Sequence, residues 1–178
     1  MRVLLLALAA VLTAGLVKFA LAKPPIEVRF PRAARESAAR RNLAHFTEGP
    51  TVRASSVLWA ARHHPGYLVD GWQHPVLLAK WVSAPGDAAP WAEVQFDRAR
   101  EVDEVALELA SAHERLPPEP RYRIECFAGA TLVASLPVEA NSAARPRHAL
   151  RCPATDRVRV TFAPADMVRL YELEAWGK

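Results

Sequence analysis

Histidine is the residue whose placement first suggests chemistry in this chain. His63, His64 and His74 fall on either side of the Asp70-Gly71 pair. Imidazole nitrogens bind transition metals, so one interpretation of this cluster is a metal site. Neighbouring side chains usually point apart, however, and exposed loops often carry histidine. We therefore favour loop histidines over a transition-metal centre.

Sequence motifs of the common enzyme classes are absent. Serine, histidine and aspartate are present, but no G-x-S-x-G elbow would expose a nucleophilic serine. The chain also lacks the zinc motif H-E-x-x-H and any glycine-rich loop that would hold a nucleotide phosphate. We predict that the protein is not an enzyme and binds no nucleotide.

Residues 1–22 have the composition of a bacterial export signal. Arg2 precedes an apolar run over 3–17, and Ala20-Leu21-Ala22 has the small-x-small pattern of a cleavage site. If Lys18 extends toward the interface, the segment also reaches the roughly 20 residues of a membrane helix. A cleaved signal peptide and a retained inner-membrane anchor are both open alternatives. Both place the rest of the chain outside the cytoplasm, in the periplasm or secreted.

Residues 23–40 are predicted to form a basic linker. Arginine outnumbers acidic residues there, and Pro31 suits the first turn of a short helix over 32–41. One interpretation is a solvated spacer. The other is a contact with anionic lipid headgroups or an acidic partner, where each basic residue would contribute about 1 kcal/mol.

The two cysteines, Cys126 and Cys152, both fall at positions that we expect to be buried on strands. Their wide spacing excludes C-x-x-C redox chemistry, haem attachment through C-x-x-C-H and metal sites built on paired cysteines. An exported chain meets oxidising conditions, so we predict a disulfide between them. The alternative is two separate thiols in the core.

Composition is that of an ordinary globular domain. Hydrophobic residues make up 51% of the chain and charged residues 24%. The formal net charge is +4, and two of these positive charges, Arg2 and Lys18, belong to the N-terminal segment. The remainder lacks the strongly basic stripe expected of a nucleic-acid-binding protein. We therefore expect no nucleic-acid partner.

Alternation of apolar and polar residues predicts β-strands throughout the rest of the chain. In residues 91–97, for example, Ala92, Val94 and Phe96 alternate with polar or aromatic neighbours. Asp97 to Glu101 is interpreted as a charged turn. Further candidate strands cover 102–109, 121–127, 131–138, 147–152, 157–162 and 168–176. Many short strands separated by turn signals indicate a β-sandwich or jelly roll.

The order of these parts resembles the discoidin-type domain, also called the coagulation factor 5/8 C-terminal or galactose-binding-like domain. Six segments within about residues 41–178 carry the resemblance: Asn42-Leu43-Ala44, Ala54-Ser55-Ser56, Tyr67 to Gly71, Trp81-Val82-Ser83, Trp91 to Phe96 and Val168 to Gly177. The family implies a jelly-roll sandwich that binds ligands without catalysing a reaction. Its members bind very different ligands.

The resemblance also implies a structural Ca²⁺. Glycan-binding members often hold this ion near the Asp-Gly turn, with backbone carbonyls, the turn aspartate and a glutamate of the closing strand. The matching residues here are Asp70 and Glu172, whose oxygens suit Ca²⁺. Residues 72–78 depart from the family pattern, because oxygen-bearing side chains are scarce there. The alternative is that Asp70 caps a turn and Glu172 forms a salt bridge.

Ligand contacts in this family come from loops at one end of the sandwich. Aromatic faces stack on sugar rings, and Arg or His can hydrogen-bond to hydroxyls, which makes these residues the candidates: Trp59, His63, His64, Tyr67, Trp72, His74, His113 and Arg115. The alternative for Trp59 and Trp72 is that they fill the bottom of the barrel. The apolar run over 75–78 is unusual for a wet loop and would be core or a contact patch for another protein.

The predicted fold is therefore all-β: a galactose-binding-like jelly-roll β-sandwich over 41–178, preceded by an N-terminal hydrophobic helix. The favoured function is an accessory subunit, tethered by residues 1–22 and docked on a larger protein complex in or at the membrane. The alternative is glycan recognition at the cell envelope. The first requires a retained helix and an apolar patch; the second requires an exposed Trp or Tyr beside His and Arg.

Overall fold

The computed structural model describes residues 25–33, 39–71, 79–111, 114–116, 120–164 and 167–178. Within these residues the elements follow the order β1 (Ile26–Arg29), β2 (Arg41–Asn42), η1 (Phe46–Glu48), β3 (Thr51–Ala54), η2 (Pro65–Val69), β4 (Trp81–Val82), β5 (Trp91–Glu108), β6 (Tyr122–Ala128), β7 (Thr131–Val138), β8 (Arg147–Phe162), β9 (Arg169–Leu170) and β10 (Glu172–Gly177). The two η elements are short 3₁₀ helices. The all-β prediction is confirmed for the described residues.

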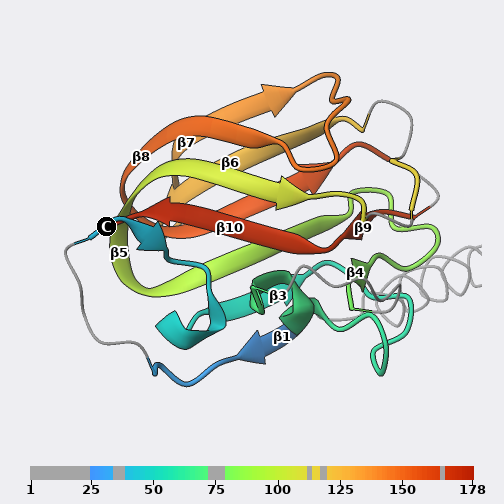
Figure 1. Cartoon of the computed structure of the whole chain (residues 1–178), viewed down its shortest axis with the longest axis horizontal. Helices are drawn as coiled ribbons and strands as arrows, with labels where there is room; N and C mark the ends of the chain where they lie inside the picture. Colours follow the sequence, from blue (N-terminus) through green and yellow to red (C-terminus); the bar gives the residue numbers. More distant parts are fainter. Residues whose placement is uncertain (1–24, 34–38, 72–78, 112–113, 117–119, 165–166) are drawn as a thin grey trace, which may run out of the picture.

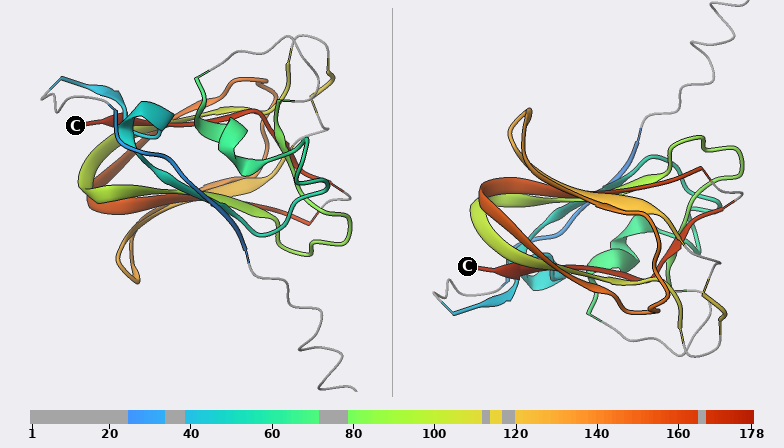
Figure 2. Two further views of the ribbon diagram at one scale, coloured as in Figure 1. Left: turned by 90° about the horizontal axis from the view of Figure 1, so that it is seen from below. Right: turned by 90° about the horizontal axis from the view of Figure 1, so that it is seen from above.

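Two layers of antiparallel strands face each other, and the long strands β5 and β8 run through both (Figure 1, Figure 2). The six-strand layer has the order β1-β3-β5-β8-β6-β7. The four-strand layer consists of β2, β10 and the remaining halves of β5 and β8. β5 pairs with β8 over Trp91–Gln95 in the first layer and over Val102–Ala106 in the second.

The stretch from Asp97 to Glu101 is not a turn, so this part of the sequence interpretation is wrong. β5 continues through it and bends from one layer into the other, with register shifts on both sides of Arg100. Arg100 is 6% exposed and donates to the Asp97 carboxylate at 2.7 Å. β8, the strand paired with β5, bends at the same place, where Ala154 has a φ of 48°. The charged residues stabilise a bend, and irregularities of this kind let a strand change direction.

The core lies between the two layers and comes from the alternating positions of the predicted strands. Val94 on β5, Ile124 on β6, Val160 on β8 and Leu173 on β10 have no exposed surface. Trp81 on β4 is also fully buried and closes one end of this core. The period-2 pattern therefore identified the buried faces correctly, because successive side chains of a strand point to opposite sides.

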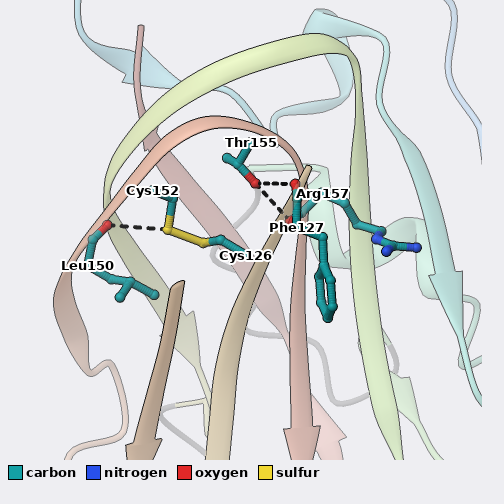
Figure 3. Close-up of a disulfide and its surroundings, with 6 residues drawn as sticks. All are labelled: Cys126, Phe127, Leu150, Cys152, Thr155 and Arg157. Carbon is teal, nitrogen blue, oxygen red and sulfur yellow. Dashed lines mark hydrogen bonds between the residues drawn. A yellow bond between two sulfur atoms is a disulfide. The ribbon is translucent and has the colours of Figure 1, made fainter. Parts of the chain in front are cut away.

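Cys126 on β6 and Cys152 on β8 form a disulfide, which confirms the sequence prediction (Figure 3). Their Cα atoms are 6.1 Å apart and both residues are fully buried. Beside them the hydroxyl of Thr155 donates to the carbonyl oxygen of Phe127 at 2.7 Å. The covalent bond and this hydrogen bond both attach the bend of β8 to β6.

Part of the predicted basic linker is a strand. Ile26–Arg29 forms β1 and pairs antiparallel with β3, so the linker prediction is corrected for these four residues. The alternation of Ile26 and Val28 with Glu27 and Arg29 is a strand signal. The arginine content of the stretch obscured this signal at the sequence level. Residues 34–38 of the short helix expected after Pro31 lie outside the described residues.

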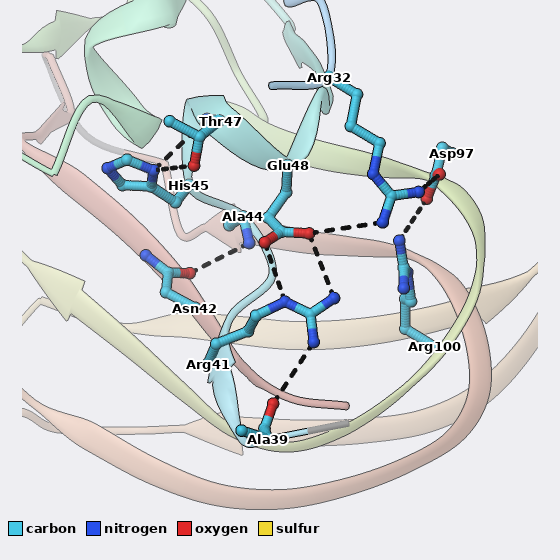
Figure 4. Close-up of polar contacts among 10 residues, drawn as sticks. All are labelled: Arg32, Ala39, Arg41, Asn42, Ala44, His45, Thr47, Glu48, Asp97 and Arg100. Atoms are coloured by element: carbon cyan, nitrogen blue, oxygen red, sulfur yellow. Dashed lines mark hydrogen bonds and ion pairs between the residues drawn. The ribbon is translucent and has the colours of Figure 1, made fainter. Parts of the chain in front are cut away.

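Arginines of this stretch bind acidic side chains of the same chain. Arg41 pairs with Glu48 at 2.9 Å, and Arg32 pairs with Asp97 at 2.7 Å (Figure 4). Glu48 is only 7% exposed, so the Arg41 contact attaches the chain to the side of the sandwich. Arg29 and Arg40 also have acidic partners: Glu27 and Asp103. These contacts give the arginines an intramolecular role that neither the spacer nor the lipid-contact interpretation included.

The predicted hydrophobic helix over 1–22 lies outside the described residues. Within the residues that are described, no helix is both long and apolar enough to cross a membrane. The membrane-anchor and signal-peptide alternatives therefore stay predictions from the sequence.

Candidate functional site at the loop end of the sandwich

The loops that follow β3, β4, β5 and β8 gather at the end of the sandwich opposite the two bends (Figure 1, right-hand side). Backbone hydrogen bonds join them, from Leu58 to Val82 at 2.8 Å and from Ser83 to Val168 at 3.0 Å. We call this region, formed by the described residues of 55–71, 79–90, 109–120 and 163–168, the loop end.

Two adjacent serines fix the loop between β4 and β5. The hydroxyls of Ser55 and Ser56 both donate to the carboxylate of Asp87. Burial alone would raise the pKa of Asp87, but these hydrogen bonds outweigh it and lower the pKa below its ordinary value. The Ser56 carbonyl also accepts the indole N–H of Trp81 at 2.8 Å. The Ala-Ser-Ser motif is therefore a structural anchor for the loop end.

Trp59 is the large aromatic side chain that the loop end exposes to solvent. It is 53% exposed, and its carbonyl accepts the amides of Arg62 at 2.9 Å and His63 at 2.8 Å in a tight turn. The Arg62 guanidinium lies 4.7 Å from the centre of the indole ring, a cation–π geometry. The turn thus places an indole face and guanidinium donors together at the surface.

A partly buried cluster of charged side chains, formed by Lys80, Glu114 and Arg169, also belongs to the loop end and the adjoining strand β9. Lys80 is 5% exposed, and its ammonium contacts the carboxylate of Glu114 and the hydroxyl of Tyr171, the latter at 3.1 Å. Arg169 lies 4.0 Å from the other oxygen of Glu114. Burial raises the pKa of Tyr171 to about 12, while hydrogen bonds from Lys80 and Tyr171 outweigh burial and lower that of Glu114. The cluster connects the loop after β5 with the residue before β4 and with the segment formed by β9 and Tyr171.

Glu172 and Asp70 lie close together where β10 begins. Glu172 is 5% exposed, and one of its oxygens accepts the amide of Gly71 at 3.0 Å. Its other oxygen is buried and has no hydrogen-bond partner among the described residues. Burial, together with the negative charge of Asp70, raises the pKa of Glu172 to about 9. An unpartnered carboxylate oxygen beside a second carboxylate is an arrangement that a cation would stabilise.

A pocket of about 140 Å³ opens beside Glu172 on the four-strand layer. Two arginines line it and are paired with glutamates: Arg145 with Glu108 at 2.8 Å, and Arg147 with Glu174 at 3.8 Å. The pocket is therefore polar, and the positive charges of its two arginines are largely neutralised by the paired glutamates.

No protein-family model and no curated protein matches this sequence. Solved structures do match its fold. A Streptococcus pneumoniae fucose-binding module superposes with a TM-score of 0.66 at 15% identity, over 78% of this chain and 98% of that chain. The lectin domain of lectinolysin, solved with Lewis B antigen, gives 0.65 at 16% identity over 78% and 97%. A chitosan-binding module from Paenibacillus sp. IK-5 gives 0.58 at 22% identity over 77% and 99%.

The fold is the galactose-binding-like jelly roll. The resemblance inferred from six short segments is confirmed at the level of the fold. Identities of this size say nothing by themselves about the ligand.

Within the galactose-binding-like sandwich, the predicted ligand residues separate into distinct groups. Trp59 is exposed, so the alternative that it fills the barrel is wrong for this residue. His63 lies beside it, half-buried, with a pKa lowered chiefly by burial. His64 instead caps η2, because its Nδ1 accepts the amide of Gly66 at 3.2 Å.

The other predicted ligand residues lie apart from Trp59 in the sequence or outside the described residues. Arg115 is exposed next to Glu114, and Tyr67 is half-buried in η2. Trp72, His74 and His113 lie outside the described residues, as does the apolar run over 75–78.

Sequence reasoning missed Arg62, Lys80 and Glu114. Arg62 had a detectable signal, because it lies three residues after an aromatic residue in a stretch without strand periodicity. Lys80 and Glu114 are 34 residues apart and meet only through the strand order. The pattern of the sequence contains no sign of that pairing.

Proposed function

We propose that this chain is an exported, non-catalytic glycan-binding module with its binding surface at the loop end. The observation that carries the proposal is Trp59, which is 53% exposed beside the Arg62 guanidinium while Trp81 is fully buried in the core. An exposed indole offers an apolar face to the C–H groups of a sugar ring. The Arg62 guanidinium supplies hydrogen-bond donors for its hydroxyls.

Two further facts support this proposal. Structures of the same fold include a fucose-binding module, a lectin domain with Lewis B antigen and a chitosan-binding module, and this chain covers almost all of each. Two enzymes also match, a yeast allantoicase and a Ruminococcus gnavus fucosidase, but this chain covers only 43% and 27% of them. The Cys126–Cys152 disulfide supports export, since disulfides persist in oxidising compartments.

We expect Trp59→Ala to weaken glycan binding at least about tenfold, because exposed tryptophans that stack on a ligand dominate binding energy. A panel of oligosaccharides, including neutral fucosylated ones and amine-bearing chitosan-derived ones, identifies the ligand, and calorimetry on wild type and variant measures the loss. Trp176→Ala is the matched control, since Trp176 lies on the four-strand layer between Arg40 and Arg147. Equal affinities of Trp59→Ala and wild type would refute the loop-end site.

We further propose that Asp70 and Glu172 help to hold a structural Ca²⁺. The donor set fits a hard cation, because two carboxylates are close and one buried oxygen of Glu172 has no partner. The described residues contain no cluster of three or more His, Cys, Asp or Glu side chains that could hold a metal. Backbone carbonyls, which the family resemblance implies as further ligands, would complete the coordination. A bound ion would fix the Asp70-Gly71 turn against β10.

The calcium proposal predicts a thermal response. At about ten times the dissociation constant, Ca²⁺ should stabilise the fold by about 1.4 kcal/mol, or a rise of roughly 4 °C in unfolding temperature. Glu172→Gln should abolish the rise while Glu174→Gln keeps it. An unchanged unfolding temperature of the wild-type protein from chelator to millimolar Ca²⁺ would contradict the proposal.

The accessory-subunit function stays a prediction from the sequence. The segments that carry it, residues 1–22 and 75–78, lie outside the described residues. The solved structures of the same fold favour glycan recognition over docking on a membrane complex.

A further inference from the structure

The outward surface of the six-strand layer carries a row of cationic and polar side chains. Strand register places Arg29 opposite Thr51, Thr51 opposite Gln95 and Gln95 opposite Arg157, one residue from each of four adjacent strands. The alternating residues Val52, Val94 and Val158 are fully buried, so this row points away from the core. With strands about 4.8 Å apart, the two arginines are separated by roughly 14 Å.

The neighbouring row contains the acidic residues of this surface, and they are already paired. Glu93 accepts from Arg159 at 2.6 Å, and Glu27 accepts from Arg53 at 2.6 Å and Arg29 at 2.7 Å. Five arginines and four acidic residues face outward on β1, β3, β6 and the adjoining parts of β5 and β8, an excess of one positive charge: Arg29, Arg53, Arg123, Arg157 and Arg159 against Glu27, Glu93, Asp97 and Glu125. We call this surface the arginine face.

Hydrogen-bonding capacity is left over on the arginine face. The side chain of Arg29 is 76% exposed, although its guanidinium contacts Glu27. The side chain of Arg157 is 21% exposed, although its buried Nε lies 3.5 Å from Glu93 and its Nη2 donates to the carbonyl oxygen of Gly129 at 2.9 Å. Arg157 and Arg159 also stack on aromatic rings, at 4.5 Å from Phe127 and 4.3 Å from Trp91. Stacking holds the guanidinium planes in place, and Arg159 also donates to Glu93 through Nε at 2.8 Å and Nη2 at 2.6 Å.

A hollow of about 250 Å³ lies on this row, lined by Arg29, Thr51, Arg53 and Gln95 among others. Its one carboxylate, Asp97, is paired with Arg32 and Arg100, each at 2.7 Å. The polar lining does not suit an apolar peptide or a lipid chain. A phosphate backbone, with a charge at every nucleotide, would require a larger basic field than an excess of one positive charge.

We propose that the arginine face binds an acidic glycan, through its carboxylate or sulfate groups, at a second site separate from Trp59. Arg29 and Arg157 would contact the anionic groups, and Thr51 and Gln95 would hydrogen-bond the hydroxyls between them. This proposal is independent of the loop-end site, because the two surfaces share no residue.

The test measures binding of full-length protein to oligogalacturonate and to sulfated heparin oligosaccharides, with neutral dextran and oligo-dT as comparison polymers. We expect at least one acidic glycan to bind, and its affinity to fall when salt rises from about 50 mM to about 300 mM. Which glycan binds distinguishes carboxylate from sulfate recognition. Oligo-dT binding as tight as the acidic glycans, or no binding of either acidic glycan at low salt, would overturn the proposal.

Variants locate the site. Arg29→Gln should weaken acidic-glycan binding at least threefold, and Glu27→Gln, which removes an exposed negative charge, should strengthen it about twofold. Arg151→Gln removes the same charge from an exposed position in the other half of β8 and should leave the affinity unchanged. Trp59→Ala should also leave it unchanged, which separates this site from the loop end. Equal losses for Arg29→Gln and Arg151→Gln would show a general charge effect and refute the site.

Discussion

The double variant Cys126→Ala/Cys152→Ala should unfold about 10 °C below the wild-type protein. The disulfide joins residues 26 apart in sequence, and a closed loop of that size lowers the entropy of the unfolded chain by the equivalent of about 3 kcal/mol. For a domain of this length, each kcal/mol corresponds to roughly 3–4 °C in unfolding temperature. Alanine is the appropriate replacement because both positions are fully buried and serine would add a buried hydroxyl.

Reduction provides the matched comparison. Wild-type protein unfolded in the presence of a strong reductant should lose about the same stability, and the double variant should be insensitive to the reductant. The reduced protein should remain folded, because the core around Cys126 and Cys152 also contains the fully buried side chains of Ile124, Val158 and Val160. A decrease of less than about 3 °C in the double variant would contradict the chain-entropy argument.

The strands of the sandwich were predictable from sequence because one face of each is buried. Val94 and Phe96, for example, are buried and alternate in the sequence with residues that point to the other side of the strand. The bend at Asp97–Glu101 was not predictable in the same way. Charged residues usually mark a turn, and only the pairing of β5 with β8 in both layers shows that the strand continues. β1 was missed because its two apolar residues are few and the arginines of the surrounding stretch obscured their alternation.

The candidate site was predictable in part. Trp59 was a candidate because tryptophan can stack on sugars, but nothing in the sequence showed whether its indole is exposed or buried in the core. His64 has the same chemistry as His63, yet the local turn uses it as a cap for η2. The Lys80–Tyr171 contact joins residues 91 apart, which only the strand order brings together. Long-range contacts of this kind depend on which strands become neighbours, and the alternation within a single strand does not specify its neighbours.

Glu93→Ala should lower the free energy of unfolding by about 3 kcal/mol, since deleting one partner of a buried ion pair costs about 3–5 kcal/mol. Glu93 is 1% exposed, and its carboxylate is 2.6 Å from Arg159, 3.5 Å from Arg157 and 3.8 Å from Arg53. Without it, three guanidinium groups face one another with no anion between them. The arginine side chains keep 21–31% exposure, which places the loss at the lower end of the range.

Urea unfolding of two further variants separates charge from packing. Glu93→Gln keeps the size and a hydrogen-bond acceptor but removes the charge, so a loss close to that of Glu93→Ala would assign the effect to electrostatics. Glu125→Ala, which also lies beside Arg159 in register but is half-exposed, should change stability by no more than about 0.5 kcal/mol. A Glu93→Ala loss below about 1 kcal/mol would mean that water already screens the three arginines. The carboxylate would then contribute little to joining β3, β5 and β8 across this surface.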